Sequence, residues 1–255
     1  MTTIGCDLGS LYTKLVLLKE RDLVSWKIVP TTGNIAQQID GFLKELLSSA
    51  GMSFEQIDQI SATGMGANLV KGAKVVDILT SLRQLVKLFP SPVEYLIDLG
   101  GQSITCLHLN PEGELIDFMR NDKCASGSGR FLELMSKKLE IGLEEIDRFV
   151  QRAKNPIELS NQCGVFAESE VISYINQGVE KAEIIAGVCS SVAKMVSAQA
   201  RRLGVNGVFT ITGGGAKINS LLEMIKAKVN GSFQPFPFNP HLAGAVGSAL
   251  SGDSL

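Results

Sequence analysis

An internal repeat limits the folds open to this chain more than any other feature of its sequence. The first copy begins Ile4-Gly-Cys-Asp-Leu-Gly-Ser10, and the second begins Tyr95-Leu-Ile-Asp-Leu-Gly-Gly101. The aspartate and the glycine that follows it recur at the same spacing, 91 residues apart. Each copy has three short β-rich runs joined by tight turns, and helical periodicity follows. The repeat therefore predicts two halves of one ancestral α/β fold, with a cleft between them.

Apolar residues at helical spacing predict the elements that cover these sheets. Four amphipathic segments have this pattern, at 35–47, 79–89, 131–139 and about 182–203. We interpret their apolar stripes as core. The β-branched run 208–212 predicts a strand that enters a glycine turn, and the small residues of 243–250 predict a closely packed helix.

Prolines mark the candidate domain crossings, at Pro90 and Pro92 and within 235–240. We therefore expect an N-terminal domain of residues 1–91 and a second domain of residues 92–240. A C-terminal helix of about 241–255 is expected to pack back on the first domain.

Composition narrows the class of protein. The chain has 255 residues, of which 45% are hydrophobic and 20% charged, with a net charge of −2, which is typical of a globular protein. No apolar run approaches the roughly 18–20 residues of a membrane span, and no basic block favours nucleic acid. The start of the chain has neither a basic segment nor an apolar leader. We expect a cytoplasmic protein that binds neither membranes nor nucleic acid.

The first glycine turn, Asp7-Leu-Gly-Ser10, has the residues of a phosphate site. Gly9 lets backbone N–H groups approach an anion closely. Ser10 offers a hydroxyl donor, and Lys14 offers a positive charge. Asp7, at the end of a strand, can hold Mg²⁺ through water.

The second copy supplies a matching turn with Asp98, Gly100, Gly101 and Gln102. A single Asp-x-Gly is weak evidence, because ordinary turns use both residues constantly. Two such turns in register, with a third glycine turn at 213–215, favour a nucleotide with Mg²⁺.

The repeat resembles the sugar kinase/Hsp70/actin superfamily of ATPases. Its phosphate-1 motif is similar to Asp7-Leu-Gly-Ser-Leu-Tyr-Thr-Lys14, its phosphate-2 motif to Asp98-Leu-Gly-Gly-Gln102, and its adenosine motif to Thr212-Gly-Gly-Gly215. The resemblance implies two ribonuclease-H-like domains of the actin/Hsp70 type that close on Mg-ATP. The implied nucleotide-binding residues are Gly9, Ser10, Leu11, Tyr12, Thr13, Lys14, Gly100, Gly101, Gln102, Gly213, Gly214 and Gly215. The implied catalytic residues are Asp7 and Asp98, which hold Mg²⁺, and Gln102, which can orient the attacking water.

Two of the five cysteines stand in a context that suggests chemistry. Cys124 lies just before a predicted helix N-terminus, where a thiolate or an anionic cluster is favoured. Cys163 lies in a polar turn 39 residues later, and no Cys-x-x-Cys is present. Spacing alone leaves two interpretations: two ordinary thiols, or a cluster site completed by a two-fold dimer with four thiolates. Cys6, Cys106 and Cys189 lie in apolar runs and are expected in the core.

Cys124 and Cys163 each lie in a long sequence motif. Asn-Asp-Lys-Cys-Ala-Ser-Gly-Ser-Gly-Arg-Phe-Leu (121–132) and Cys-Gly-Val-Phe-Ala-Glu-Ser-Glu-Val-Ile-Ser (163–173) resemble the activator ATPases of 2-hydroxyacyl-CoA dehydratases, the BadF/BadG/BcrA/BcrD type. The resemblance implies a homodimer with one 4Fe–4S cluster held by Cys124 and Cys163 of each subunit. It also implies hydrolysis of ATP to ADP coupled to electron transfer. The donor would be ferredoxin or flavodoxin, and the acceptor an iron–sulfur dehydratase or a double-cubane cluster protein.

The chain departs from this family at several positions. Thr63-Gly-Met-Gly-Ala67 stands where the family usually has Thr-Gly-Tyr-Gly-Arg. Ser103 and Thr105 replace a common Asp and Lys, and Ile218 replaces a common Asn. These changes leave the identity of the electron acceptor open between the two kinds of protein.

Three polar side chains have less definite roles. Glu168 is either a coupling or water-positioning group or a capping or surface carboxylate. His108 is expected to be structural, and no catalytic role is carried over to His241.

Two other functions remain open at this stage. A sugar-type kinase of the same superfamily, such as an N-acetylhexosamine kinase, needs a catalytic Asp in a sugar cleft but not Cys124 and Cys163. A non-enzymatic, ATP-gated interaction module, as in actin-like or chaperone proteins, is the second.

Overall fold

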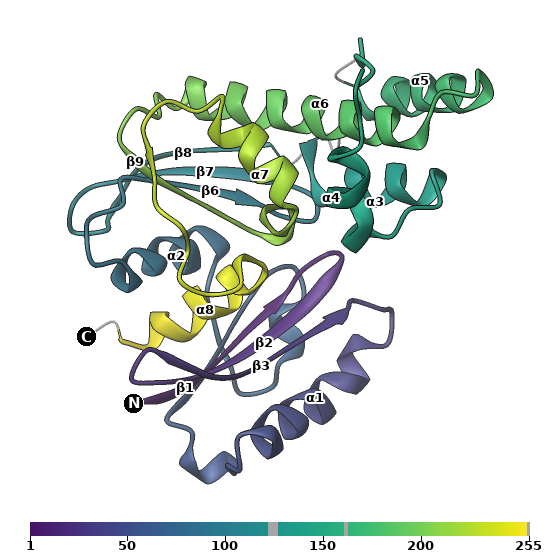
Figure 1. Ribbon diagram of the computed structural model, residues 1–255. Coiled ribbons are helices and arrows are strands. Elements are labelled where there is room, and N and C mark those ends of the chain that lie inside the picture. The colour runs from purple at the N-terminus through teal and green to yellow at the C-terminus, as the bar shows by residue number, and fades with distance from the viewer. Residues whose placement is uncertain (122–126, 161–162, 254–255) are drawn as a thin grey trace. The chain divides into compact units, whose positions relative to one another are not determined.

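The computed structural model describes residues 1–121, 127–160 and 163–253, and the chain divides into two compact units (Figure 1). Unit 1 comprises Met1–Glu94, Leu109–Ile116 and Phe236–Leu255. Unit 2 comprises Tyr95–His108 and Asp117–Pro235. Each unit has its own sheet and its own hydrophobic core.

Unit 1 is built on a five-stranded sheet with the order β3-β2-β1-β4-β5. Its strands are β1 (Thr2–Leu8), β2 (Tyr12–Lys19), β3 (Asp22–Pro30), β4 (Gln59–Thr63) and β5 (Lys74–Val75). The first three strands are antiparallel, whereas β4 runs parallel to β1 and β5 parallel to β4. This register places Lys14 opposite Asp7 on one side and Thr63 beside Asp7 on the other.

Helices cover both faces of this sheet. They are α1 (Ile35–Ser49), α2 (Ile78–Arg83) and α8 (Ala243–Leu250), with short 3-10 helices η1 (Phe54–Gln56), η2 (Ala67–Leu69), η3 (Gln84–Leu88), η7 (Pro240–Leu242) and η8 (Ser251–Asp253). The stripe of α1 (Ile35, Ile39, Leu43, Leu46 and Leu47) is buried against apolar side chains of β1 and β2. The interpretation of this stripe as core is confirmed.

The C-terminal helix α8 packs on β1 through residues that have little or no side chain. A Cβ at Gly5 would lie 1.9 Å from the carbonyl oxygen of Ala245, so the two backbones are in direct contact. All eight residues of α8 are buried. The small residues of 243–250 form a closely packed helix, as predicted, and larger side chains would push this helix off the strand.

Unit 2 is built on a sheet with the order β10-β9-β6-β7-β8. Its strands are β6 (Tyr95–Leu99), β7 (Ile104–Leu109), β8 (Leu115–Asn121), β9 (Val208–Thr212) and β10 (Ser232–Phe233). β6 pairs antiparallel with β7 and parallel with β9, just as β1 pairs with β2 and β4. The same strand order in both sheets confirms the repeat and the predicted α/β fold class.

Helices of unit 2 form the larger core. They are α3 (Gly129–Lys138), α4 (Ile146–Val150), α5 (Gly164–Asn176), α6 (Lys181–Arg202) and α7 (Asn219–Lys226), with η5 (Leu143–Glu145) and η6 (Gly214–Lys217). The long helix α6 supplies Val188, Val192 and Val196, which are fully buried in one cluster with Ile97 and Ile211 of the sheet. None of the helices in the described part of the chain is long and apolar enough to cross a membrane.

The helix predicted over 79–89 is shorter than expected. Helix α2 ends at Arg83, and η3 continues to Leu88 with the tighter bond from Phe89 N–H to the Val86 carbonyl, 3.1 Å. Pro90 has no N–H to donate to Val86 in the α-helical pattern, so the last turn tightens.

Candidate functional site

The turn between β1 and β2 is closed by its own backbone. The N–H of Gly9 donates to the carbonyl of Tyr12 at 3.1 Å. A Cβ at Gly9 would lie 2.9 Å from Nζ of Lys14 and 3.0 Å from the Tyr12 oxygen. Glycine therefore lets the ammonium group and the turn approach each other without a shift of either one.

A buried ion pair sits directly behind this turn. Nζ of Lys14 lies 2.7 Å from Oδ2 of Asp7, and the two side chains are 10% and 12% exposed. Lys14 also donates to the carbonyl of Tyr12 at 3.1 Å. An ammonium group has three donors, so these two contacts leave one for an anion at the turn.

Two further glycines close around the Asp7 carboxylate, and sequence reasoning did not find this arrangement. A Cβ at Gly64, which follows β4 and has φ of +86°, would lie 2.8 Å from Oδ1. A Cβ at Gly244 in α8 would lie 2.6 Å from Oδ2. Both glycines lie far from Asp7 in the sequence. The available sequence signal was that Gly64 belongs to the Thr63–Ala67 motif and Gly244 to the small-residue run 243–250.

The matching turn of unit 2 follows β6. The N–H of Gly100 donates to the carbonyl of Ser103 at 2.9 Å, and Gln102 is exposed at this turn. Oδ1 of Asp98 accepts a hydrogen bond of 2.8 Å from the hydroxyl of Thr212, at the end of β9. That bond orients the carboxylate at the end of the strand.

The third glycine turn lies against the second one. Gly213 has φ of +89°, and a Cβ there would lie 2.3 Å from the carbonyl oxygen of Leu99. A Cβ at Gly215 would lie 3.0 Å from Cβ of Leu99. Unit 2 therefore brings Asp98, the 100–102 turn and the 213–215 turn together, as one set of neighbouring residues.

Helix α3 is attached to the 100–102 turn through its first residues. The N–H of Gly129 donates to the carbonyl of Gly100 at 3.0 Å, and the N–H of Arg130 donates to that of Gly101 at 2.9 Å. These helix N–H groups have no partner within the helix, so the turn satisfies them. Cys124, the predicted ligand that precedes this helix, lies outside the described residues.

Cys163 differs from the other described cysteines. It is the exposed N-cap residue of α5, and its carbonyl accepts from the N–H of Ala167 at 2.9 Å. Cys6, Cys106 and Cys189 are buried, as predicted, and burial raises the pKa of each thiol from 9.0 to about 12. Cys163 is therefore the described cysteine whose exposure suits a ligand. Among the described residues, no group of three or more His, Cys, Asp or Glu is arranged to hold a metal ion.

The remaining polar candidates have structural partners. Glu168 on α5 pairs with Lys138 of α3 at 2.8 Å, with both side chains about a third exposed. His108 stacks on Tyr95 with ring centroids 4.5 Å apart. His241 meets the ring of Tyr12 edge-on at 5.0 Å, which places it beside the 9–14 turn.

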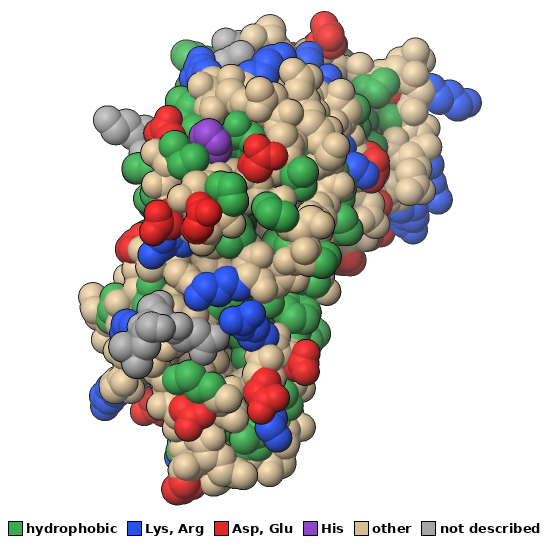
Figure 2. Space-filling model, turned by 90° about the vertical axis from the view of Figure 1, so that its left-hand side faces the viewer, with side chains coloured by type: hydrophobic (Ala, Val, Ile, Leu, Met, Phe, Trp, Pro, Cys, Tyr) green, Lys and Arg blue, Asp and Glu red, His purple; other side chains and the backbone are tan. Residues whose placement is uncertain are grey.

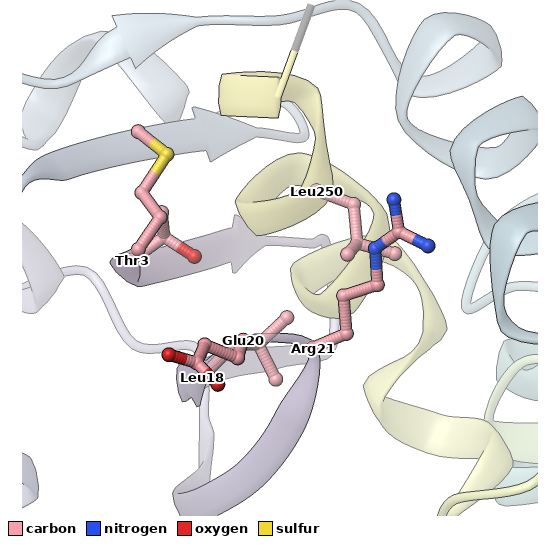
Figure 3. A pocket seen from close by; sticks show the side chains of 6 residues that line it. Thr3, Leu18, Glu20, Arg21 and Leu250 are labelled. Carbon is pink, nitrogen blue, oxygen red and sulfur yellow. The ribbon is translucent and has the colours of Figure 1, made fainter.

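A cavity of about 250 Å³ in unit 1 is lined by Met1, Thr3, Leu18, Glu20, Arg21 and Leu250 (Figure 3). None of these residues belongs to a glycine turn, so the cavity is separate from the candidate site. On the face drawn in Figure 2, Lys and Arg side chains are interspersed with Asp and Glu side chains.

Two sheets of the same strand order, each with an Asp-containing glycine turn after its first strand, define the class of protein: an α/β fold of the sugar-kinase and actin-like type. A glucokinase of the ROK family from Streptomyces griseus has this fold, with a TM-score of 0.59 and 14% identity over 98% of both chains.

The chain belongs to the BadF/BadG/BcrA/BcrD ATPase family, which it matches over residues 4–252. It is similar to the activator of the 2-hydroxyisocaproyl-CoA dehydratase from Clostridium difficile, solved with bound ADPNP, with 34% identity and a TM-score of 0.90 over 98% of this chain and 93% of that one. It is also 34% identical to the activator of lactoyl-CoA dehydratase from Anaerotignum propionicum, over 98% of this chain and 96% of the relative. The resemblance to this family is confirmed.

Proposed function

We propose that this chain is an ATP-dependent activator that transfers one low-potential electron to an iron–sulfur protein, with hydrolysis of ATP to ADP. The observation that carries the proposal is the exposed Cys163 at the N-cap of α5, in a chain whose other described cysteines are buried. Family membership and the two activators named above support it.

Unit 1 contributes the phosphate-1 residues of the nucleotide site. Lys14 and Ser10 bind phosphate oxygens, and the backbone of residues 9–13 lines the turn. Asp7 holds Mg²⁺ through water. The fit of a hydrated metal is supported by the absence of side chains at Gly64 and Gly244, since a Cβ at either position would touch the carboxylate.

Unit 2 contributes the phosphate-2 and adenosine residues. Thr212 orients the carboxylate of Asp98, which would hold the metal, and the exposed Gln102 would position the attacking water. The glycines at 213 and 215 let this turn pack directly on Leu99, which keeps the adenosine residues next to the phosphate-2 residues. The ADPNP bound to the similar activator supports a nucleotide here.

Cys163 and Cys124 act as ligands of a 4Fe–4S cluster, which supplies one-electron storage at low potential when bound. Cys163 fits this role, because its side chain is exposed and a helix N-terminus favours negative charge. Two cysteines from each of two copies give the four thiolates required, so the active species is a homodimer. Val165 and Phe166 follow Cys163 and are 70% and 59% exposed, which suits burial by a second copy.

The chain works in the cytoplasm with ferredoxin or flavodoxin as donor. Its acceptor is an iron–sulfur dehydratase of the 2-hydroxyacyl-CoA type or a double-cubane protein. ATP contributes only by binding two states of the protein differently. The bonds from Gly129 and Arg130 to the carbonyls of Gly100 and Gly101 give the nucleotide a direct connection to the helix that follows Cys124.

Anaerobic purification from iron-supplemented cells tests the proposal. The protein should be brown, dimeric and able to hydrolyse ATP. Cys124→Ser and Cys163→Ser should each lose the iron and keep ADPNP binding, whereas Cys189→Ser, which changes a buried thiol, should keep both. A colourless, iron-free wild-type preparation would refute the proposed cluster.

A further inference from the structure

Ser160, three residues before Cys163 in the chain, is hydrogen-bonded to helix α5, whose N-cap is Cys163. Oε2 of Glu170 accepts a hydrogen bond of 2.8 Å from the N–H of Ser160, and Oε1 accepts one of 2.6 Å from the Ser160 hydroxyl. Both carboxylate oxygens therefore bind the same residue. Ionised carboxylates form stronger hydrogen bonds than neutral acceptors, so this is a firm attachment.

Helix geometry explains why Glu170 reaches Ser160. Glu170 stands seven residues after Cys163, which is close to two turns, so both residues lie on the same side of α5. Helical side chains point toward the N-terminus of their helix. The carboxylate is therefore directed back along the helix toward Ser160, three residues before Cys163 in the chain.

The consequence concerns the backbone at Cys163. On its C-terminal side, the residue is fixed by the bond from Ala167 N–H to its carbonyl, 2.9 Å. On its N-terminal side, Ser160 is fixed to the body of the same helix by Glu170. Helix α5 therefore holds both the carbonyl of Cys163 and Ser160, three residues earlier, although Cys163 itself is exposed.

We infer that Glu170 is a positioning residue for Cys163, acting through Ser160 to hold the thiolate where two copies of the chain can share a cluster. The inference rests on the proposed function for the role of Cys163, but the attachment itself is independent of any cluster. Glu168, two residues earlier, differs in its partner: it binds Lys138 of α3 and not Ser160.

The test compares Glu170→Ala and Glu170→Gln with Glu168→Gln, which removes the same charge from the same helix. In iron-free full-length protein, hydrogen exchange at the Ser160 amide should become about tenfold faster in Glu170→Ala, as expected for loss of a charge-assisted bond. Glu170→Gln should be intermediate, because its amide keeps one acceptor oxygen. Glu168→Gln should match the wild type. An unchanged rate of hydrogen exchange at the Ser160 amide in Glu170→Ala would show that Ser160 is not hydrogen-bonded to Glu170 in solution.

The second measurement uses the iron-loaded dimer. In Glu170→Ala, iron should pass to a chelator about tenfold faster than in the wild type, and the visible circular dichroism of the cluster should change. Faster amide exchange with unchanged iron release and an unchanged spectrum would overturn the positioning role and leave a purely structural bond. A wild-type protein without iron would instead refute the proposed function, and the exchange measurement would still test the attachment.

Discussion

Gly5→Ala tests whether the C-terminal helix is part of unit 1, because it adds one methyl group between two backbones in contact. The new Cβ would lie 1.9 Å from the Ala245 oxygen and 2.8 Å from Cβ of Ala249. Cβ atoms in real structures essentially never lie within 3.0 Å of such an atom, so α8 must move away by about 1 Å or more. Overpacking of this kind costs up to about 3 kcal/mol. For a chain of this size the cost corresponds to a melting temperature lower by roughly 6–12 °C.

Gly41→Ala is the matched control. Gly41 is exposed within α1, and a Cβ there meets nothing within 4 Å. The same substitution should therefore stabilise the protein, by about 0.5–1 kcal/mol, because alanine favours the helix. Calorimetry should show a lower melting temperature than the wild type for Gly5→Ala and a higher one for Gly41→Ala.

A second readout links this packing to the nucleotide. Gly244 of α8 lies against the carboxylate of Asp7, which belongs to the proposed nucleotide site. Displacement of the helix in Gly5→Ala should therefore also weaken ADPNP binding. Gly41→Ala should bind ADPNP normally. A Gly5→Ala protein as stable as the wild type would refute the argument that α8 and β1 are in backbone contact.

Three other predictions follow from buried charged or titratable groups. Asp7→Asn should destabilise the protein by about 3 kcal/mol in urea unfolding, since it leaves the Lys14 charge buried without its partner, and Asp7→Asn/Lys14→Met should recover part of the loss; additive effects would argue against the pair. Lys14→Ala should weaken ADPNP binding at least about tenfold in titration calorimetry, and unchanged affinity would remove Lys14 from the phosphate site. Stability should fall as pH rises from 9 toward 12, because burial raises the pKa of the Cys6, Cys106 and Cys189 thiols from 9.0 to about 12, so the unfolded chain loses these protons first; replacing the three cysteines by alanine should flatten this part of the pH profile.

Local patterns in the sequence were sufficient for much of the fold. The run 208–212 is β9, and 243–250 is α8, with the predicted bounds. The repeat predicted that the two sheets are similar, because a strand–turn–strand motif spans only a few consecutive residues and can be recognised in the sequence. The predicted helix over 79–89 was longer than α2, because apolar spacing does not distinguish an α-helix from a 3-10 turn ahead of a proline.

The candidate site was only partly predictable. The three glycine turns were found because each is a short word in the sequence. The glycines around Asp7 and the hydrogen bonds that Ser160 donates to Glu170 were not, because they depend on tertiary packing or on side-chain direction. Cys163 was found through the words around it, and the structure adds that it is exposed whereas three other cysteines are buried.

The repeat has diverged at one position that bears on how the two turns divide the chemistry. Lys14 stands opposite Asp7 in unit 1, and the equivalent partner of Asp98 in unit 2 is Thr105. The first turn therefore combines an anion with a cation that can bind phosphate, whereas at this cross-strand position the second turn pairs its carboxylate with a neutral residue. In unit 1 the ammonium group of Lys14, 2.7 Å from the Asp7 carboxylate, balances much of the charge of that carboxylate. We therefore expect a main contribution of Asp7 to be holding Lys14 in place for a phosphate.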